Sequence, residues 1–509
     1  MRGPRPASMP GVPRPQLQGP GVLRRRYVRS APGAPLEAVA LDAPRPAAGA
    51  SGAVAAPVGA PPQRVGTLGR LLASGRVVPL FILMLICCQL ALLVPAMAPL
   101  RVVVRILAFG LSLLLLVAVR GRALKHPALP FVMGAIGVTA LNFFNPGTSG
   151  VLASLVQLGI QLSIAAPLLW VTRLPIDAKT FRLTLALLFL FNVASAGVGV
   201  LQVYFPGRFQ PAVSSMVQGL GEGYLRSLEF ETTSGERVFR PMGLTDTPGG
   251  AATGGFYAVL LGGGFLLSSR RGLIRVLSVG GILLGLLCLY LCQVRATFVT
   301  LGVCLLAMAG VLALSGRLAR LLTLLAVVGI GAVSAFGWAV AVGGDTVLAR
   351  WTSLLDGRPE EVYRRHRGGF VLRSFEEHLP EYPLGAGLGR YGMAYAYFGD
   401  PTDLERPPLW VEVQWSAWIF DGGILTVVLY PLGLLATLWW VFRIARRKED
   451  SEGEFWLWGS VVFAYNLGAL ALTFSYPFFM SQMGMEFWLL NAALFGAMAH
   501  AKTVHAHRG

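Results

Sequence analysis

Long apolar runs are the feature that most restricts what this chain can fold into. An α-helix needs roughly 17–25 apolar residues to cross the hydrocarbon core of a bilayer. Runs of that kind lie at 77–99, 102–119, 127–144, 150–172, 183–204, 251–268, 273–292, 296–315, 321–343, 411–441, 455–475 and 479–500. Arg105 and Asn142 interrupt the second and third of them. Because backbone groups in lipid must be paired within their own segment, the runs predict an all-α polytopic membrane protein with about twelve transmembrane helices.

Composition supports a membrane protein and argues against nucleic-acid binding. The chain is 54% hydrophobic and 13% charged, and its mean hydropathy of +0.62 is far above that of a soluble domain. The formal net charge of +18 comes from basic residues spread over short segments between apolar runs. That distribution is typical of a topology signal, so we expect membrane lipids as partners and no nucleic acid.

Two regions differ in composition. Residues 1–76 are rich in Pro, Ala, Gly and Arg, with eleven arginines against Glu37 and Asp42. Such a segment cannot bury enough apolar surface to fold, so we expect a disordered basic tail in the cytoplasm. Residues 77–509 are expected to form one membrane domain.

The loops between runs orient the chain. Alternate short loops carry most of the basic residues that flank the runs, such as Arg120, Arg122 and Lys125 in one loop and Arg443, Arg446 and Arg447 in another. The positive-inside rule therefore predicts cytoplasmic N- and C-termini. It also places two long loops, at about 205–250 and 344–410, on the outer face.

These two long loops contain twelve arginines and no lysine. The guanidinium group binds phosphate oxygens with two parallel hydrogen bonds and keeps its charge, which suits a site for a phosphorylated lipid or polyanion. The alternative explanation for the excess of arginine over lysine is a genome that favours arginine codons, with the loop charges simply solvated.

The first long loop ends in RPMGLTDTPGG and leads directly into the run at 251–268. Proline and glycine predict irregular backbone there, which is tolerated at membrane depth only where it is buried in protein or lines a cavity. We therefore expect Arg240 at the mouth of a cavity. Arg295 opens the run at 296–315 and is the second candidate, with a simple interfacial anchor as the alternative.

The second long loop is denser in charge. Four residues at 364–367 precede a pattern in which apolar side chains recur at helical intervals from Gly369 until Pro380 and Pro383. The pattern predicts a short amphipathic helix on the outer surface. The preceding cluster consists of Arg364, Arg365, His366 and Arg367. A loop with its own helix is typically functional, although a solvated charge run is the alternative for any single arginine.

Carboxylates within or beside membrane spans are costly and are functional candidates by default. Glu412 lies near the outer boundary and can reach a substrate there, whereas Asp421 lies deeper and can pair with the backbone or another helix. Glu486, and Gln157 and Gln161 four residues apart on one helix face, are interpreted as contacts between helices.

Together these features resemble the superfamily of bacterial O-antigen polymerases and O-antigen ligases. The similarity covers most of the chain beyond residue 77. It consists of the stretch at 240–250, the arginine at 295 that opens a span, and the sequence PLGAGLGRY at 383–391, preceded by Arg367 and Phe370. The last motif is the most specific of the three.

The resemblance implies an enzyme of the bacterial inner membrane that assembles surface polysaccharide such as O-antigen, exopolysaccharide or capsule. It would transfer a glycan from an undecaprenyl-pyrophosphate donor to a sugar hydroxyl at the periplasmic face. Arg240, Arg295 and Arg367 would stabilise the departing pyrophosphate without a metal or cofactor. Expected partners are the lipid-linked oligosaccharide, a flippase and a chain-length regulator. Further substrate contacts are expected from Arg364, Arg365, Arg373 and Arg390.

The acceptor hydroxyl must lose a proton, and a buried carboxylate or imidazole can accept it. Glu412 is the first candidate and His366 the second. The alternatives are a salt bridge from Glu412 to a loop arginine and a surface position for His366. Ligases of the superfamily carry a His-Asn pair where this chain has Glu412, which favours a repeat-unit polymerase over a ligase. A flippase and a purely structural partner remain open, although we find no internal repeat typical of a transporter.

Overall fold

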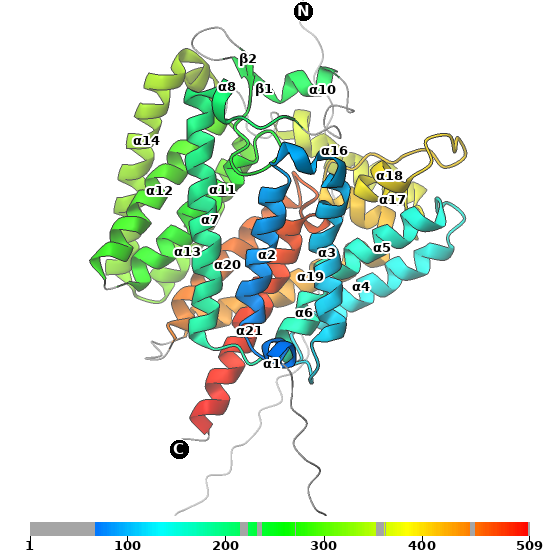
Figure 1. The fold of residues 1–509 in the computed structure, drawn as a ribbon, viewed down its shortest axis with the longest axis horizontal. Coiled ribbons are helices and arrows are strands. Elements are labelled where there is room, and N and C mark those ends of the chain that lie inside the picture. The colour runs from blue at the N-terminus through cyan, green and yellow to red at the C-terminus, as the bar shows by residue number, and fades with distance from the viewer. Residues whose placement is uncertain are drawn as a thin grey trace, which may run out of the picture. The chain divides into compact units, whose positions relative to one another are not determined.

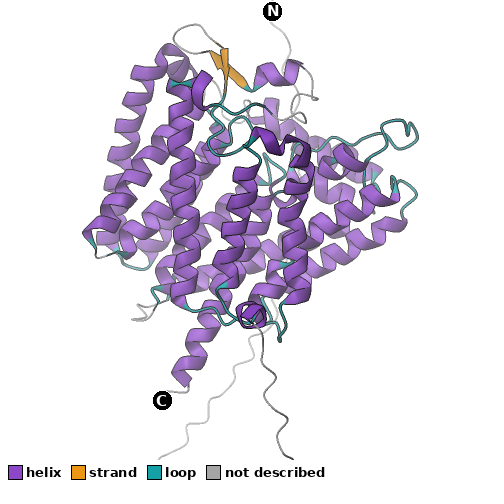
Figure 2. Cartoon of the chain, viewed as in Figure 1, coloured by secondary structure: helices purple, strands orange, loops and turns teal. Residues whose placement is uncertain are grey.

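The computed structural model describes residues 67–213, 222–231, 237–269, 271–352, 361, 363–447 and 453–506. These residues are almost entirely helical, as Figure 2 shows. Most of the predicted tail lies outside them. Its last part includes a short helix, α1 (Thr67–Leu72), whose Leu72 packs against the hydrophobic core.

The predicted apolar runs all form helices, so the all-α class is confirmed and the protein is a multi-pass membrane protein. Among the described residues, nine helices are long and apolar enough to cross a bilayer. Two of them include short neighbouring helices: η1 (Pro95–Leu100) precedes α3, and α6 (Pro167–Trp170) and η3 (Val171–Arg173) follow α5. The nine contain α3 (Arg101–Ala118), α5 (Val151–Ala165), α7 (Ala178–Tyr204), α11 (Ala251–Ser268), α12 (Gly272–Cys292), α13 (Arg295–Leu314), α14 (Leu318–Thr352), α19 (Gln414–Ala445) and α20 (Phe455–Leu472).

The other three predicted spans are also helices, but each is either too short or not apolar enough to count as a membrane span. Helix α2 (Val77–Ala91) has 15 residues and α4 (Leu129–Leu141) has 13, and η2 (Asn142–Phe144) extends α4 by one turn. Helix α21 (Gln482–Ala506) has 25 residues, but polar side chains such as Glu486 reduce its hydropathy. Length and composition therefore support nine of the twelve predicted crossings.

The membrane helices run side by side, and the two long loops gather at one end of the bundle (Figure 1). We call this the loop end. Helix α1 and the last turns of α21 lie at the opposite end.

Helix α11 is the most buried of the candidate spans. Its Gly255 faces Gly285 of α12, where an added Cβ would lie only 2.7 Å from the Gly285 carbonyl oxygen, so the glycines let the two backbones approach closely.

The first long loop contains short elements. Helices α8 (Pro206–Phe209) and α10 (Glu222–Ser227) are followed by strands β1 (Glu229–Glu231) and β2 (Arg237–Phe239). The strands pair antiparallel with Phe230 opposite Val238. This two-stranded ribbon is the sole β-structure in the described part of the chain.

The second long loop contains the helix expected from residue 369, and it is longer than predicted. It runs without a break through η4 (Arg364–Gly368), α16 (Gly369–Arg373), η5 (Ser374–His378) and α17 (Leu379–Glu381). Pro380 is accommodated in its last turn. The helix ends before Pro383 because a proline disfavours helical geometry in the preceding residue, and Tyr382 has φ −124° and ψ 60°. Helix α18 (Gly392–Phe398) follows.

Candidate functional site

A cavity of about 490 Å³ opens at the loop end, and its lining is amphipathic. Helices α2, α3 and α7 supply an apolar wall. That wall consists of Ile82, Leu85, Ile86, Leu92, Phe109, Leu188 and Phe191. The polar part of the lining includes Arg105, Asn192, Asp246, Tyr257 and Glu486. Apolar ligands and charged ligands can therefore both find complementary surface in one space.

Arg105 on α3 connects the two long loops inside this cavity. Its guanidinium forms an ion pair with Asp246 of the first loop. It also donates a hydrogen bond of 2.8 Å to the Tyr397 hydroxyl of α18 in the second loop. Sequence reasoning treated Arg105 as an interruption of an apolar run and did not select it. The available signal was the presence of a charge inside a span, which is functional by default.

Glu486 of α21 lines the same cavity and is held by tyrosines. Its Oε2 accepts a 2.9 Å hydrogen bond from the Tyr257 hydroxyl of α11, and that hydroxyl lies 2.8 Å from the Tyr465 hydroxyl of α20. The predicted contact between helices is therefore present. The cavity gives Glu486 a second property that sequence reasoning missed, because this carboxylate also faces the space in which a ligand can bind.

The segment that follows Arg240 is irregular, as predicted, and α7 satisfies its backbone. Gln202 Oε1 accepts hydrogen bonds from the amides of Met242 at 2.7 Å and Gly243 at 2.8 Å. Ser195 Oγ accepts one from the Leu244 amide at 3.0 Å. The same segment lines the cavity through Thr245, Asp246, Thr247 and Gly250. Polar side chains of a membrane helix thus make non-helical backbone tolerable at this depth.

Arg240 lies beside the turn from α12 to α13, and Arg295 is the first residue of α13. Neither arginine is among the described residues that line the cavity, so the expected position of Arg240 at its mouth is not found. Gly249, at φ +82°, is packed so closely that a Cβ there would lie 3.3 Å from Val294 and 4.0 Å from Arg240 Cδ. The buried donors Gln293 Nε2 and Arg295 Nε have no hydrogen-bond partner among the described residues. Both donor atoms are shielded from solvent, so a hydrogen-bond acceptor such as a phosphate reaches them only if the turn rearranges.

Glu412 forms an ion pair with Arg367, the arrangement expected under the salt-bridge alternative. Its second oxygen accepts a 2.9 Å hydrogen bond from Trp410 Nε1. Each carboxylate oxygen therefore already accepts one hydrogen bond, and each retains a further lone pair. The catalytic roles of both residues remain predictions.

The other predicted arginines of the second loop differ in environment. Arg364 and Arg373 are exposed, and Arg373 pairs with Glu377 at 3.3 Å. The predictions for Arg365 and His366 lie outside the described side chains. Arg390 is buried, and it donates to the carbonyl of Ala386 at 3.2 Å and twice to that of Pro407, at 3.1 and 3.0 Å. Its side chain therefore braces the loop.

The PLGAGLGRY segment, residues 383–391, packs into a break in α19. Gly423 has φ +60°, and an added Cβ would lie 1.9 Å from the Pro383 carbonyl oxygen, so no other residue fits. The backbone groups freed by the break are paired with the segment. Ile424 N donates to Pro383 O at 3.0 Å, and Ala386 N donates to Phe420 O at 2.9 Å.

Asp421, just before this break, is buried and accepts three hydrogen bonds. The donors are Gln157 Nε2 at 2.7 Å, Gln161 Nε2 at 2.8 Å and the Tyr391 hydroxyl at 2.5 Å. Burial, with Asp421 nearby, raises the pKa of Tyr391 well above its usual value, so its hydroxyl remains a donor. Gln157 Oε1 in turn accepts from the Gly389 amide at 2.7 Å. The network positions residues 383–391 against α5 and α19.

No protein-family model matches this chain, and no curated protein matches it either. Three parts of the site lie at the loop end. They are the amphipathic cavity, the α12–α13 turn beside Arg240 and Arg295, and the segment 383–391, which the Asp421 network holds against α5 and α19.

Proposed function

We propose that the protein is a membrane glycosyltransferase that uses an undecaprenyl-pyrophosphate-linked glycan as donor and extends a surface polysaccharide at the periplasmic face. The observation that carries the proposal is the amphipathic cavity in which both long loops meet at Arg105. A polyprenyl carrier requires an apolar wall, whereas its pyrophosphate and sugars require cations and hydrogen-bond partners. The cavity offers the apolar wall and the hydrogen-bond partners, whereas its described lining has one arginine, Arg105, which is paired with Asp246. Further cations would have to come from arginines outside the lining.

The arginines fit the leaving group. As the glycosidic bond to the donor breaks, charge develops on the pyrophosphate, and fixed guanidinium groups stabilise it best where little water is present. Arg240 lies beside the turn that Arg295 follows, and the buried donors Gln293 Nε2 and Arg295 Nε lack partners within the described structure. These two arginines are the best supported of the predicted pyrophosphate ligands.

The reaction also requires a base. The acceptor oxygen bonds to the anomeric carbon, the bond from that carbon to the pyrophosphate oxygen breaks, and the hydroxyl proton passes to a carboxylate. Glu412 is the residue predicted from sequence, but it pairs with Arg367 and is not among the described residues that line the cavity. Glu486 lines the cavity and has Oε2 held by Tyr257, while Oε1 has no donor among the described residues. Glu486 is therefore the better placed base.

Chain extension by the purified protein tests the proposal. Lipid-linked repeat units from cells that lack the gene would be incubated with the protein, and longer glycans and released undecaprenyl pyrophosphate would be measured. We expect both products with the wild type, and a decrease of roughly 10²–10⁴-fold in rate with Glu486→Gln. Glu412→Gln is the matched carboxylate variant. A large loss there, with little effect of Glu486→Gln, would return the base to Glu412.

The same assay distinguishes the proposed polymerase from a ligase and from a transporter. Transfer to lipid A core instead of a second repeat unit would identify a ligase. Movement of the lipid-linked repeat across proteoliposome membranes without any change in glycan length would identify a transporter and overturn the proposed enzyme.

A further inference from the structure

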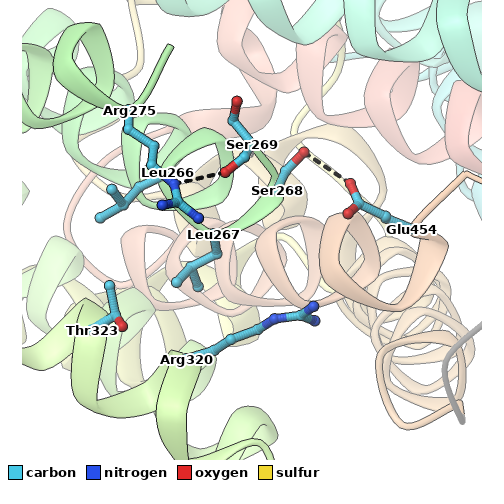
Figure 3. A pocket seen from close by; sticks show the side chains of 8 residues that line it. All are labelled: Leu266, Leu267, Ser268, Ser269, Arg275, Arg320, Thr323 and Glu454. Carbon is cyan, nitrogen blue, oxygen red and sulfur yellow. Dashed lines mark hydrogen bonds between the residues drawn. The ribbon is translucent and has the colours of Figure 1, made fainter. Parts of the chain in front are cut away.

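A second pocket lies at the opposite end of the bundle, away from the cavity. It encloses about 280 Å³ and is formed where α11 ends, α12 and α14 begin, and α20 starts (Figure 3). Its polar lining is rich in the side chains that bind phosphate oxygens. That lining consists of Ser268, Ser269, Arg275, Arg320, Thr323 and Glu454.

Arginines outnumber carboxylates among the described residues at this pocket. Glu454 accepts a 2.9 Å hydrogen bond from Ser268 Oγ and forms a 3.2 Å ion pair with Arg182. Among the described residues at this pocket, the three arginines Arg182, Arg275 and Arg320 stand against the single carboxylate of Glu454. A small anion therefore gains attraction from this pocket, and Glu454 is already neutralised by a partner outside the lining.

The two arginines of the lining are held in place from opposite sides. Arg275 of α12 donates from Nε to the Ser269 carbonyl at 2.8 Å, its one side-chain hydrogen bond within the described structure, so both terminal nitrogens remain available. Arg320 of α14 stacks over Trp456, with its guanidinium carbon 4.3 Å from the ring centroid. Figure 3 shows them on opposite sides of the pocket. Pre-positioned guanidiniums lose little entropy on binding a phosphate.

The surroundings identify the source of the phosphate. Leu273, Val276 and Leu277 of α12 are exposed next to Arg275, and Leu318 and Leu322 of α14 are exposed next to Arg320. These apolar side chains lie on helices that cross the bilayer, at the ends where lipid headgroups are found. Acyl chains can lie along this surface while the headgroup enters the pocket. A free phosphate would gain nothing from it.

We propose that this pocket binds the phosphate of an anionic phospholipid, such as phosphatidylglycerol or cardiolipin, through Arg275 and Arg320. Basic pockets between membrane helices are suited to such headgroups. The bound lipid would join α12 and α14, which carry the arginines, to the end of α11, which also lines the cavity at the loop end. The site is independent of the proposed glycan transfer.

Lipid binding to the full-length protein in detergent tests the proposal. Thermal unfolding would be followed while phosphatidylglycerol, phosphatidylcholine or inorganic phosphate is added. We expect stabilisation by phosphatidylglycerol alone, and a loss of about tenfold or more in its apparent affinity for Arg275→Gln/Arg320→Gln. Arg443→Gln/Arg446→Gln is the matched control, because it removes two charges from the same end outside the pocket.

A second variant excludes a folding defect as the cause. Thr323→Trp fills the pocket from an exposed position without changing its charge, and it should weaken phosphatidylglycerol binding while the lipid-free unfolding temperature stays near that of the wild type. Equal stabilisation by inorganic phosphate would assign the pocket to a free anion. An equal loss in the control pair, or normal lipid affinity in Thr323→Trp, would likewise overturn the lipid site.

Discussion

Replacing Gln157 by Leu tests whether the Asp421 network holds residues 383–391 in place. Gln157 is buried and bridges two groups, donating to Asp421 Oδ1 and accepting from the Gly389 amide, both at 2.7 Å. Leu has a similar volume but can do neither. The variant therefore leaves the Gly389 N–H without an acceptor and the Asp421 carboxylate with two donors instead of three.

The magnitude follows from these two losses. A hydrogen bond to a charged group contributes about 1.5–3 kcal/mol, and a buried donor without a partner costs about 1–3 kcal/mol. Gln157→Leu should therefore destabilise the protein by about 2.5–6 kcal/mol. Gln161→Leu is the matched control, since it lies one turn away on α5 and loses its 2.8 Å bond to Asp421 only. It should cost about 1.5–3 kcal/mol.

Two measurements on the purified protein check this difference. Unfolding in detergent, followed by tryptophan fluorescence, should rank the wild type first, Gln161→Leu second and Gln157→Leu last. Hydrogen exchange of the peptide that contains residues 383–391 should become faster mainly in Gln157→Leu, because that variant alone frees the Gly389 amide. Equal stability and equal exchange in the two variants would refute the inference that Gln157 couples this segment to α5.

Three further predictions concern other parts of the molecule. Arg240→Ala, Arg295→Ala and Arg367→Ala should each abolish chain extension in protein that still reaches the membrane, with poor rescue by Lys; full activity in all three would remove the arginines from the site. A cysteine at the highly exposed Leu404, in a background without native cysteines, should react with a membrane-impermeant reagent from the periplasm; labelling only from the cytoplasm would reverse the topology. Burial lowers the pKa of His126 to about 3, so below about pH 6.5 the unfolded chain takes up a proton that the native state does not. The free energy of unfolding should decrease as the pH is lowered from about 6.5 toward 3, by up to about 1.4 kcal/mol per pH unit. The decrease should be less steep in His126→Asn, and equal slopes would contradict this.

Much of the fold could be read from the sequence because its signals are local. Each apolar run contains within itself the length and hydropathy that make it a membrane helix, and every predicted run is helical. The helix near residue 369 and the irregular segment after Arg240 were likewise visible from apolar spacing, proline and glycine. Charge in the loops predicted an orientation, which the labelling experiment tests.

The composition of the site depended on tertiary structure. Gln157 and Gln161 could be predicted to contact another helix from their spacing, but their partner Asp421 lies more than 250 residues away. Arg105 meets Asp246 and Tyr397 across 141 and 292 residues. Glu486 reaches the cavity because α21 packs against α7 and α20, and it then bonds to Tyr257 of α11. A local pattern fixes the secondary structure of a segment because the backbone pairs within it. Which polar groups share a cavity depends on how the whole bundle packs, and no single segment contains that information.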